Sequence, residues 1–107
     1  MARKSLVCLY IVVPDETTAR SISELLLSQK LIACTNIIPI QSIYFWEGSL
    51  CKEGEFVIFA KTLHDKVESI ERNVIAVHPY EIPLISSWSI EVNEAYWQWV
   101  NECLEKP

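Results

Sequence analysis

Glycine and charged residues are scarce in this sequence. It holds only 2 glycines in 107 residues, 21% of its residues are charged, and 50% are hydrophobic. Such a composition excludes a disordered or low-complexity chain. The length allows one hydrophobic core. We therefore expect a single domain over residues 1–107.

Long basic and long apolar runs are also missing. Nine basic residues face 14 acidic ones, and basic residues adjoin one another only at Arg3-Lys4, so we expect no nucleic-acid partner. The apolar run Leu6–Val13 is too short to cross a bilayer. Pro14-Asp15-Glu16 follows it in place of a small-residue cleavage site. We therefore interpret the run as a strand and expect a cytoplasmic protein with no membrane partner.

Paired cysteines and local enzyme motifs are absent as well. The four cysteines are far apart, without a C-x-x-C pair, which predicts reduced and mostly buried thiols, with Cys51 exposed in a polar loop. The sequence has no G-x-x-x-x-G-K-[ST], H-E-x-x-H or G-x-S-x-G motif. We therefore do not expect an enzyme.

Hydrophobic periodicity divides the chain into alternating strands and helices. Apolar, β-branched runs predict strands, and apolar residues three and four apart predict helices. Asp15 is placed to cap the first helix, Asp65 with Glu68 resembles a capping box for the second, and Asn93 is placed to cap the third. The predicted elements are strand Leu6–Val13, helix Glu16–Lys30, strand Leu31–Trp46, polar turn Glu47–Gly54, strand Glu55–Thr62, a helix ending before His78, strand Leu84–Val92 and a helix through Leu104.

The predicted order, β-α-β-β-α-β plus a C-terminal helix, indicates an α+β, ferredoxin-like fold with an antiparallel sheet and two helices on one face. The third helix can cover part of the other face. Pro39 cannot donate a ladder hydrogen bond, so its strand must bulge or lie at an edge. The long, aromatic hairpin around Trp46 reaches past a compact core, so we expect it to pair with another subunit.

The segment His78–Pro83 is the best functional candidate. Two prolines hold an imidazole, a phenol and a carboxylate on a stiff, non-helical connection. Rigid loops that present polar side chains commonly carry function. The alternative is that the loop only connects two elements of the fold. In that case His78 forms a local hydrogen bond and Tyr80 packs against neighbouring side chains.

Several segments together resemble the CutA family of divalent-cation tolerance proteins, and the resemblance runs over almost the whole chain. They are Ala33-Cys34-Thr35-Asn36-Ile37-Ile38-Pro39, Ser42-Ile43-Tyr44-Phe45-Trp46-Glu47-Gly48, Lys61-Thr62 and His78-Pro79-Tyr80-Glu81-Ile82-Pro83, with Pro14-Asp15-Glu16 and Tyr96-x-x-Trp99. The resemblance implies a cytoplasmic homotrimer, similar in shape to PII signalling proteins, that is linked to tolerance of copper and other divalent metals. On this basis we expect Tyr44, Trp46 and Phe56 at the trimer interface.

The resemblance also suggests a metal site, with copper as the first candidate. Some family members have a proposed copper site made of an early cysteine and two adjacent histidines. Here Ile11 and Val77 stand at two of those positions, and only His78 is left. We expect His78 and Glu81 to contact the metal, with Cys34 or trimer symmetry supplying further ligands, because copper prefers several nitrogen or sulfur donors.

A second hypothesis is a PII-like sensor that binds a small anion between subunits. Lys61 supplies positive charge, Asn36 supplies a donor and an acceptor, and Tyr80 completes the predicted cleft. Alternatively, Lys61 marks a solvated strand end. A hydrolase is the third hypothesis and ranks last.

Overall fold

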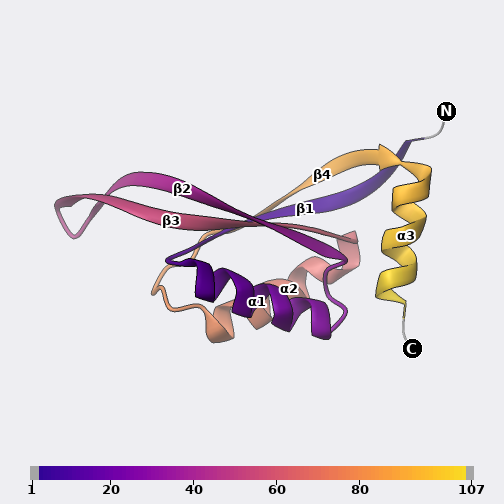
Figure 1. The fold of residues 1–107 in the computed structure, drawn as a ribbon, viewed down its shortest axis with the longest axis horizontal. Helices are drawn as coiled ribbons and strands as arrows, with labels where there is room; N and C mark the ends of the chain where they lie inside the picture. Colours follow the sequence, from indigo (N-terminus) through magenta and orange to yellow (C-terminus); the bar gives the residue numbers. More distant parts are fainter. Residues whose placement is uncertain (1–2, 106–107) are drawn as a thin grey trace.

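The computed structural model describes residues 3–105, which form one four-stranded antiparallel sheet and three α-helices (Figure 1). The strand order is β2-β3-β1-β4, with every neighbouring pair antiparallel. This confirms the predicted α+β, ferredoxin-like arrangement. The elements are β1 Arg3–Val13, α1 Glu16–Ser28, β2 Cys34–Trp46, β3 Ser49–Thr62, the short 3-10 turn His64–Lys66, α2 Val67–Val77, β4 Ile85–Asn93 and α3 Glu94–Leu104.

The main hydrophobic core lies between α1, α2 and one face of the sheet. Alternate residues of β1 point to opposite faces, so Leu9, Ile11 and Val13 all face the helices and are fully buried. Ile58 on β3 and Leu26 on α1 pack into the same cluster. The continuous apolar run of β1 reflects its place in the middle of the sheet.

The helix starts follow the sequence only in part. Asp15 caps α1 as predicted, accepting a hydrogen bond from the Thr18 N–H at 2.8 Å, which holds the pKa of Asp15 below its usual value. The capping box predicted for the second helix is wrong: a 3-10 turn precedes α2, and Lys66 is at its N-cap without a side-chain cap bond. Asp65 lies inside that turn, one position too early to cap α2.

The hairpin of β2 and β3 is longer than the sequence suggested. Trp46 pairs with Ser49, and the two residues between them, Glu47 and Gly48, both have positive φ angles. Two consecutive positive φ angles are typical of a tight type I′ turn, which adds the whole of Ser49–Gly54 to the strand. The hairpin extends well beyond the helices in Figure 1. Pro39 lies on β2, an edge strand, as one of the two predicted placements required.

Helix α3 covers one end of the sheet face that lies opposite α1 and α2 (Figure 1). Val100 and Leu104 pack there against Leu6, and the half-buried Tyr96 and Trp97 flank them. The ammonium of Lys4 lies 4.9 Å from the centre of the Trp97 ring. This confirms the prediction that the third helix covers part of the second face.

The rest of that sheet face is not covered by a helix and carries a row of aromatic side chains. Tyr10, Phe59 and Trp88 from three neighbouring strands meet edge to face, with ring centroids 5.3 and 6.4 Å apart. Trp88 is 45% exposed. Within residues 3–105, the helices are all too short or too polar to span a membrane.

Candidate functional site

His78 is held inside the chain by two hydrogen bonds from its ring. Its Nδ1 accepts the main-chain N–H of Tyr80 at 3.1 Å, and its Nε2 lies 2.8 Å from the main-chain oxygen of Val12. An N–H can only donate and a carbonyl can only accept, so Nδ1 has no proton and Nε2 carries one. The imidazole is therefore neutral, and neither nitrogen has a free lone pair.

The loop around His78 matches the local alternative in the sequence analysis. His78 is only 9% exposed, and its ring packs against the Tyr80 ring with centroids 5.0 Å apart. The preceding residue, Val77, ends α2, and the extended backbone at His78 stops the helix before Pro79. This packing places the Tyr80 phenol at a fixed point beside β3.

A groove of about 760 Å³ lies between the hairpin and this loop. We call it the hairpin groove. Apolar side chains, including Val12, Ile40 and Leu84, form part of its wall. Its polar and aromatic lining comes from Glu53 and Glu55 on β3, Tyr44 and Trp46 on β2, and Tyr80 and Glu81 in the loop.

Two tyrosine–glutamate hydrogen bonds lie in the lining of the hairpin groove. The Tyr80 hydroxyl donates to Glu55, and the Tyr44 hydroxyl donates to Glu53. The bond to Glu53 is the main reason that the pKa of Tyr44 rises to about 12. Burial, followed by the bond to Glu55, raises the pKa of Tyr80 well above its usual value. Both phenols therefore stay neutral, and their carboxylate partners act as acceptors.

Cys34 lies at the other end of the sheet from His78. Its Sγ is 3.0 Å from the hydroxyl of Tyr96, which belongs to α3. In the sheet, Cys34 lies beside Lys61 of β3, and Lys61 lies beside Cys8 of β1. Val12, the partner of His78, is four residues further along β1, roughly 13 Å at the usual rise per residue. Within one chain, the three predicted metal ligands therefore do not converge, and residues 3–105 contain no group of three His, Cys, Asp or Glu side chains suited to hold a metal.

The residues of the predicted anion cleft are also divided. The Lys61 ammonium donates to the side-chain oxygen of Asn36 on the neighbouring strand. Tyr80 lies instead beside Glu55 in the hairpin groove. An anion site built from all three residues would need a second subunit to bring Tyr80 to Lys61.

The family model described as CutA1 divalent ion tolerance protein matches residues 7–103, nearly the entire described chain. The chain belongs to this family. Protein CutA homolog from Xenopus laevis is 40% identical over 100 residues, which cover 92% of this chain and 66%, just under two thirds, of that protein.

Solved CutA structures have the same fold as this chain. CutA1 from Ehrlichia chaffeensis matches with a TM-score of 0.91 at 37% identity, covering 94% of this chain and 96% of that one. The periplasmic divalent cation tolerance protein CutA from Archaeoglobus fulgidus matches with a TM-score of 0.89 at 35% identity, covering 94% of this chain and 99% of that one. The family resemblance in the sequence is thereby confirmed.

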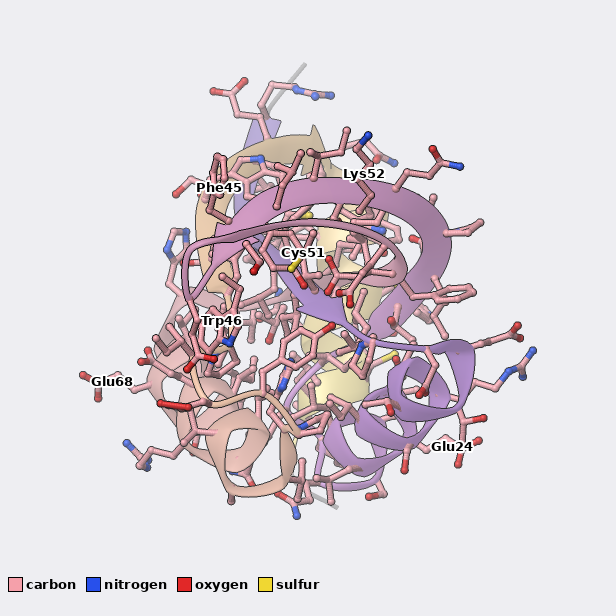
Figure 2. The ribbon with its side chains drawn as sticks, turned by 90° about the vertical axis from the view of Figure 1, so that its left-hand side faces the viewer. Glu24, Phe45, Trp46, Cys51, Lys52 and Glu68 are labelled. Atoms are coloured by element: carbon pink, nitrogen blue, oxygen red, sulfur yellow. The ribbon has the colours of Figure 1, made fainter. Side chains whose placement is uncertain are left out.

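The residues predicted for a CutA trimer interface differ in their surroundings. Tyr44 and Trp46 are 36% and 42% exposed on the hairpin, as an interface role requires. Phe56 packs instead against the core of its own chain. Figure 2 shows Phe45 and Lys52 above the curved hairpin ribbon and Trp46 beneath it.

Sequence reasoning missed the two carboxylates of β3 that line the hairpin groove. Glu53 and Glu55 are two residues apart, so in a strand they share a face. Glu53 falls inside the predicted polar turn Glu47–Gly54, which hid this spacing. The available signal was Gly48, because glycine at the second position is typical of a two-residue type I′ turn, although glutamate is an uncommon residue at the first position. The four thiols are free, but only Cys8 is buried, so the prediction of mostly buried thiols is wrong for the single chain.

Proposed function

We propose that this chain is the subunit of a cytoplasmic homotrimer that takes part in tolerance of copper and other divalent ions by binding them weakly. The observation that carries the proposal is the family match over residues 7–103. The relatives described above are named as CutA or divalent-cation tolerance proteins, not as enzymes. A binding role therefore has more support than a catalytic one.

The exposed apolar surface of the hairpin supports the trimer. Ile43, Phe45 and Leu50 are 69%, 72% and 54% exposed, and β2 and β4 are both edge strands. Apolar edge strands in water are prone to pair with other chains, so a specific partner must cover them. Light scattering should give three times the 12.3 kDa chain mass. A particle with the mass of one chain would refute the trimer.

The hydrogen bonds of His78 support weak rather than tight metal binding. A copper ion needs a nitrogen lone pair, so it must displace either the N–H of Tyr80 from Nδ1 or the proton that Nε2 donates to Val12. Each bond from a ring nitrogen to the metal therefore replaces one hydrogen bond inside the chain. In this proposal Glu81 and a Cys34 from another subunit supply the other ligands.

Calorimetric titration of copper and zinc into the purified protein tests the metal proposal. His78→Ala should weaken copper binding about tenfold or more, since one coordinating nitrogen is lost. The chain has 2 histidines, so His64→Ala is the matched control. His64 is exposed, and in the described chain its ring forms a hydrogen bond only with Ser5. Circular dichroism checks that both variants fold. Absent binding, or equal affinity in the wild type and His78→Ala, would refute the role of His78.

A further inference from the structure

Tyr96 on α3 contacts a thiol with its hydroxyl and an indole with its ring. The hydroxyl oxygen lies 3.0 Å from the Sγ of Cys34, the first residue of β2. The ring centroid lies 5.5 Å from that of Trp99, and the two ring planes are tilted by 35°. Residues three apart on a helix are neighbours on its surface, so α3 itself holds the two rings together. A continuous line of contacts therefore runs from Trp99 through Tyr96 to Cys34.

Cys34 has a different kind of partner from two of the other thiols. The Sγ atoms of Cys8 and Cys51 donate to main-chain oxygens at 3.8 Å, whereas that of Cys34 contacts a phenol. All four thiols are free of disulfide bonds. Burial, followed by the bond to Cys34, raises the pKa of Tyr96 above its usual value, so the phenol keeps its proton at neutral pH. A thiol and a phenol that both carry hydrogen thus lie at hydrogen-bond distance.

Indole, phenol and thiol are the side-chain groups that lose a single electron most readily. An electron passes between two aromatic rings when they are in contact, and a hydrogen atom passes between two heavy atoms at hydrogen-bond distance. The contact between Trp99 and Tyr96 meets the first requirement, and the contact between Tyr96 and Cys34 meets the second. The three groups are therefore placed in the order that single-electron transfer needs.

We propose that Trp99, Tyr96 and Cys34 form a radical-transfer path, which moves one-electron oxidation from the aromatic rings of α3 to the Cys34 thiol. The oxidant is a small one-electron oxidant such as the carbonate radical. The function of the path is protective, since a radical on a thiol can be repaired by a free small-molecule thiol, whereas an oxidised indole is lost to the protein.

The path conserves atoms and electrons at each step. The oxidant takes one electron from Trp99, and the indole N–H proton goes to water. Tyr96 then gives one electron to Trp99, its hydroxyl proton goes to water, and the indole nitrogen takes a proton back. Finally the S–H bond of Cys34 breaks, and its hydrogen atom joins the Tyr96 oxygen. In sum the oxidant gains an electron, water gains a proton, and Cys34 becomes a thiyl radical, to which a free thiol returns a hydrogen atom.

The path does not depend on how the subunits assemble. Both of its contacts join residues of one chain, and it requires no open pocket. It also does not use His78. Copper bound to Cys34 would occupy the thiol, so the test below contains a metal chelator, and copper binding at His78 can fail without affecting the result.

Pulse radiolysis with azide radicals, which oxidise tryptophan first, tests the path. Tryptophanyl and tyrosyl radicals absorb at different wavelengths, so both can be followed in time. Cys34→Ser keeps a hydrogen-bonding group beside Tyr96, but its O–H bond is too strong to give up a hydrogen atom. In this variant the tyrosyl radical should live about tenfold or more longer than in the wild type. Adding Tyr96→Phe to Cys34→Ser should remove the long-lived signal.

Two further variants on α3 provide matched controls. Cys103→Ala removes a thiol from the same apolar cluster as Tyr96 and should leave the tyrosyl lifetime unchanged. Trp99→Phe should lower the yield of the Tyr96 radical, whereas Trp97→Phe, at a ring that faces Lys4, should not. Circular dichroism checks that each variant folds.

Three results would overturn the proposal. Equal tyrosyl lifetimes in the wild type and Cys34→Ser would show that the contact is only structural, since serine keeps the hydrogen bond. Equal lengthening in Cys103→Ala and Cys34→Ser would show a general effect of thiols. A long-lived signal that survives Tyr96→Phe would place the radical on another tyrosine.

Discussion

The Nε2 of His78 donates to the main-chain oxygen of Val12 at 2.8 Å, across 66 positions of the sequence. This bond fastens the loop that follows α2 to the end of β1. Tyr80, two residues later, also bonds the same ring and then reaches Glu55 on β3. His78 therefore positions one wall of the hairpin groove.

Replacing His78 by alanine should destabilise the fold even without metal. The change leaves the Val12 oxygen and the Tyr80 N–H without their partners in a mostly buried place. Unsatisfied buried groups of this kind cost about 1–3 kcal/mol each before relaxation or water entry. We expect the free energy of unfolding to fall by about 1–3 kcal/mol in urea denaturation with chelator present. An unchanged midpoint would show that these bonds do not hold the loop.

Stability should decline at high pH because of Tyr44. Its pKa is raised from 10.0 to about 12 in the folded chain, so the unfolded chain loses this proton first as pH rises. The folded state then binds more protons than the unfolded state, and stability falls as pH rises through that window. Ultraviolet absorbance of phenolate, compared between wild type and Tyr44→Phe, reports the pKa.

The partner of Tyr44 provides the control for that titration. In Glu53→Gln, the charged acceptor is gone, so the Tyr44 pKa should move back toward its ordinary value. A Tyr44 titration that is the same with glutamate and with glutamine would contradict the assigned cause.

The hairpin should be the part of the surface on which assembly depends. Phe45→Glu places a charge on a side chain that is 72% exposed in the single chain, so it should be tolerated in a monomer but not inside an interface. We expect the particle mass from light scattering to fall to that of one chain. Ile75→Glu, at a position 55% exposed on α2, is the control and should leave the mass unchanged. A Phe45→Glu trimer would exclude this hairpin position from the interface.

The core under the helices should be sensitive to lost volume. Ile58 is fully buried on β3 in the cluster with Leu9 and Leu26. Ile58→Ala should lower the free energy of unfolding by about 2–5 kcal/mol, since it removes buried methyl groups and leaves a cavity. Ile75→Ala makes the same chemical change at the exposed α2 position and should stay within about 0.5 kcal/mol of wild type in the same urea experiment.

Local patterns predicted most of the fold because each element carries its own signal. The apolar run of β1 and the helical spacing of Ile22 and Leu26 gave type and order. The predictions of helix boundaries failed where two local sequence signals compete. Asp65 and Glu68 look like a capping box, but the chain first makes a 3-10 turn, and only the helix packing decides where α2 begins.

The site was harder to predict because it joins distant segments. The metal candidates His78 and Cys34 were chosen for their chemistry and their place in the family pattern. Nothing in the sequence indicated that both ring nitrogens of His78 would form hydrogen bonds, one with Val12 and one with Tyr80. Nor did it say that Glu53 would join the strand, since the length of the hairpin depends on two positive φ angles at its turn.

The sequence by itself determined the element order, the membership of the CutA1 family and the surplus of apolar surface on the hairpin. The order and the apolar surplus follow from residue periodicity and composition, which are local properties of the chain, and the family membership follows from the match of its motifs over residues 7–103. Tertiary structure alone decided that Glu55 is buried on β3 and that the Tyr80 hydroxyl lies against it. Burial and charge pairing depend on which distant segments of the chain come into contact. Here the strand register and the His78–Val12 hydrogen bond determine those contacts.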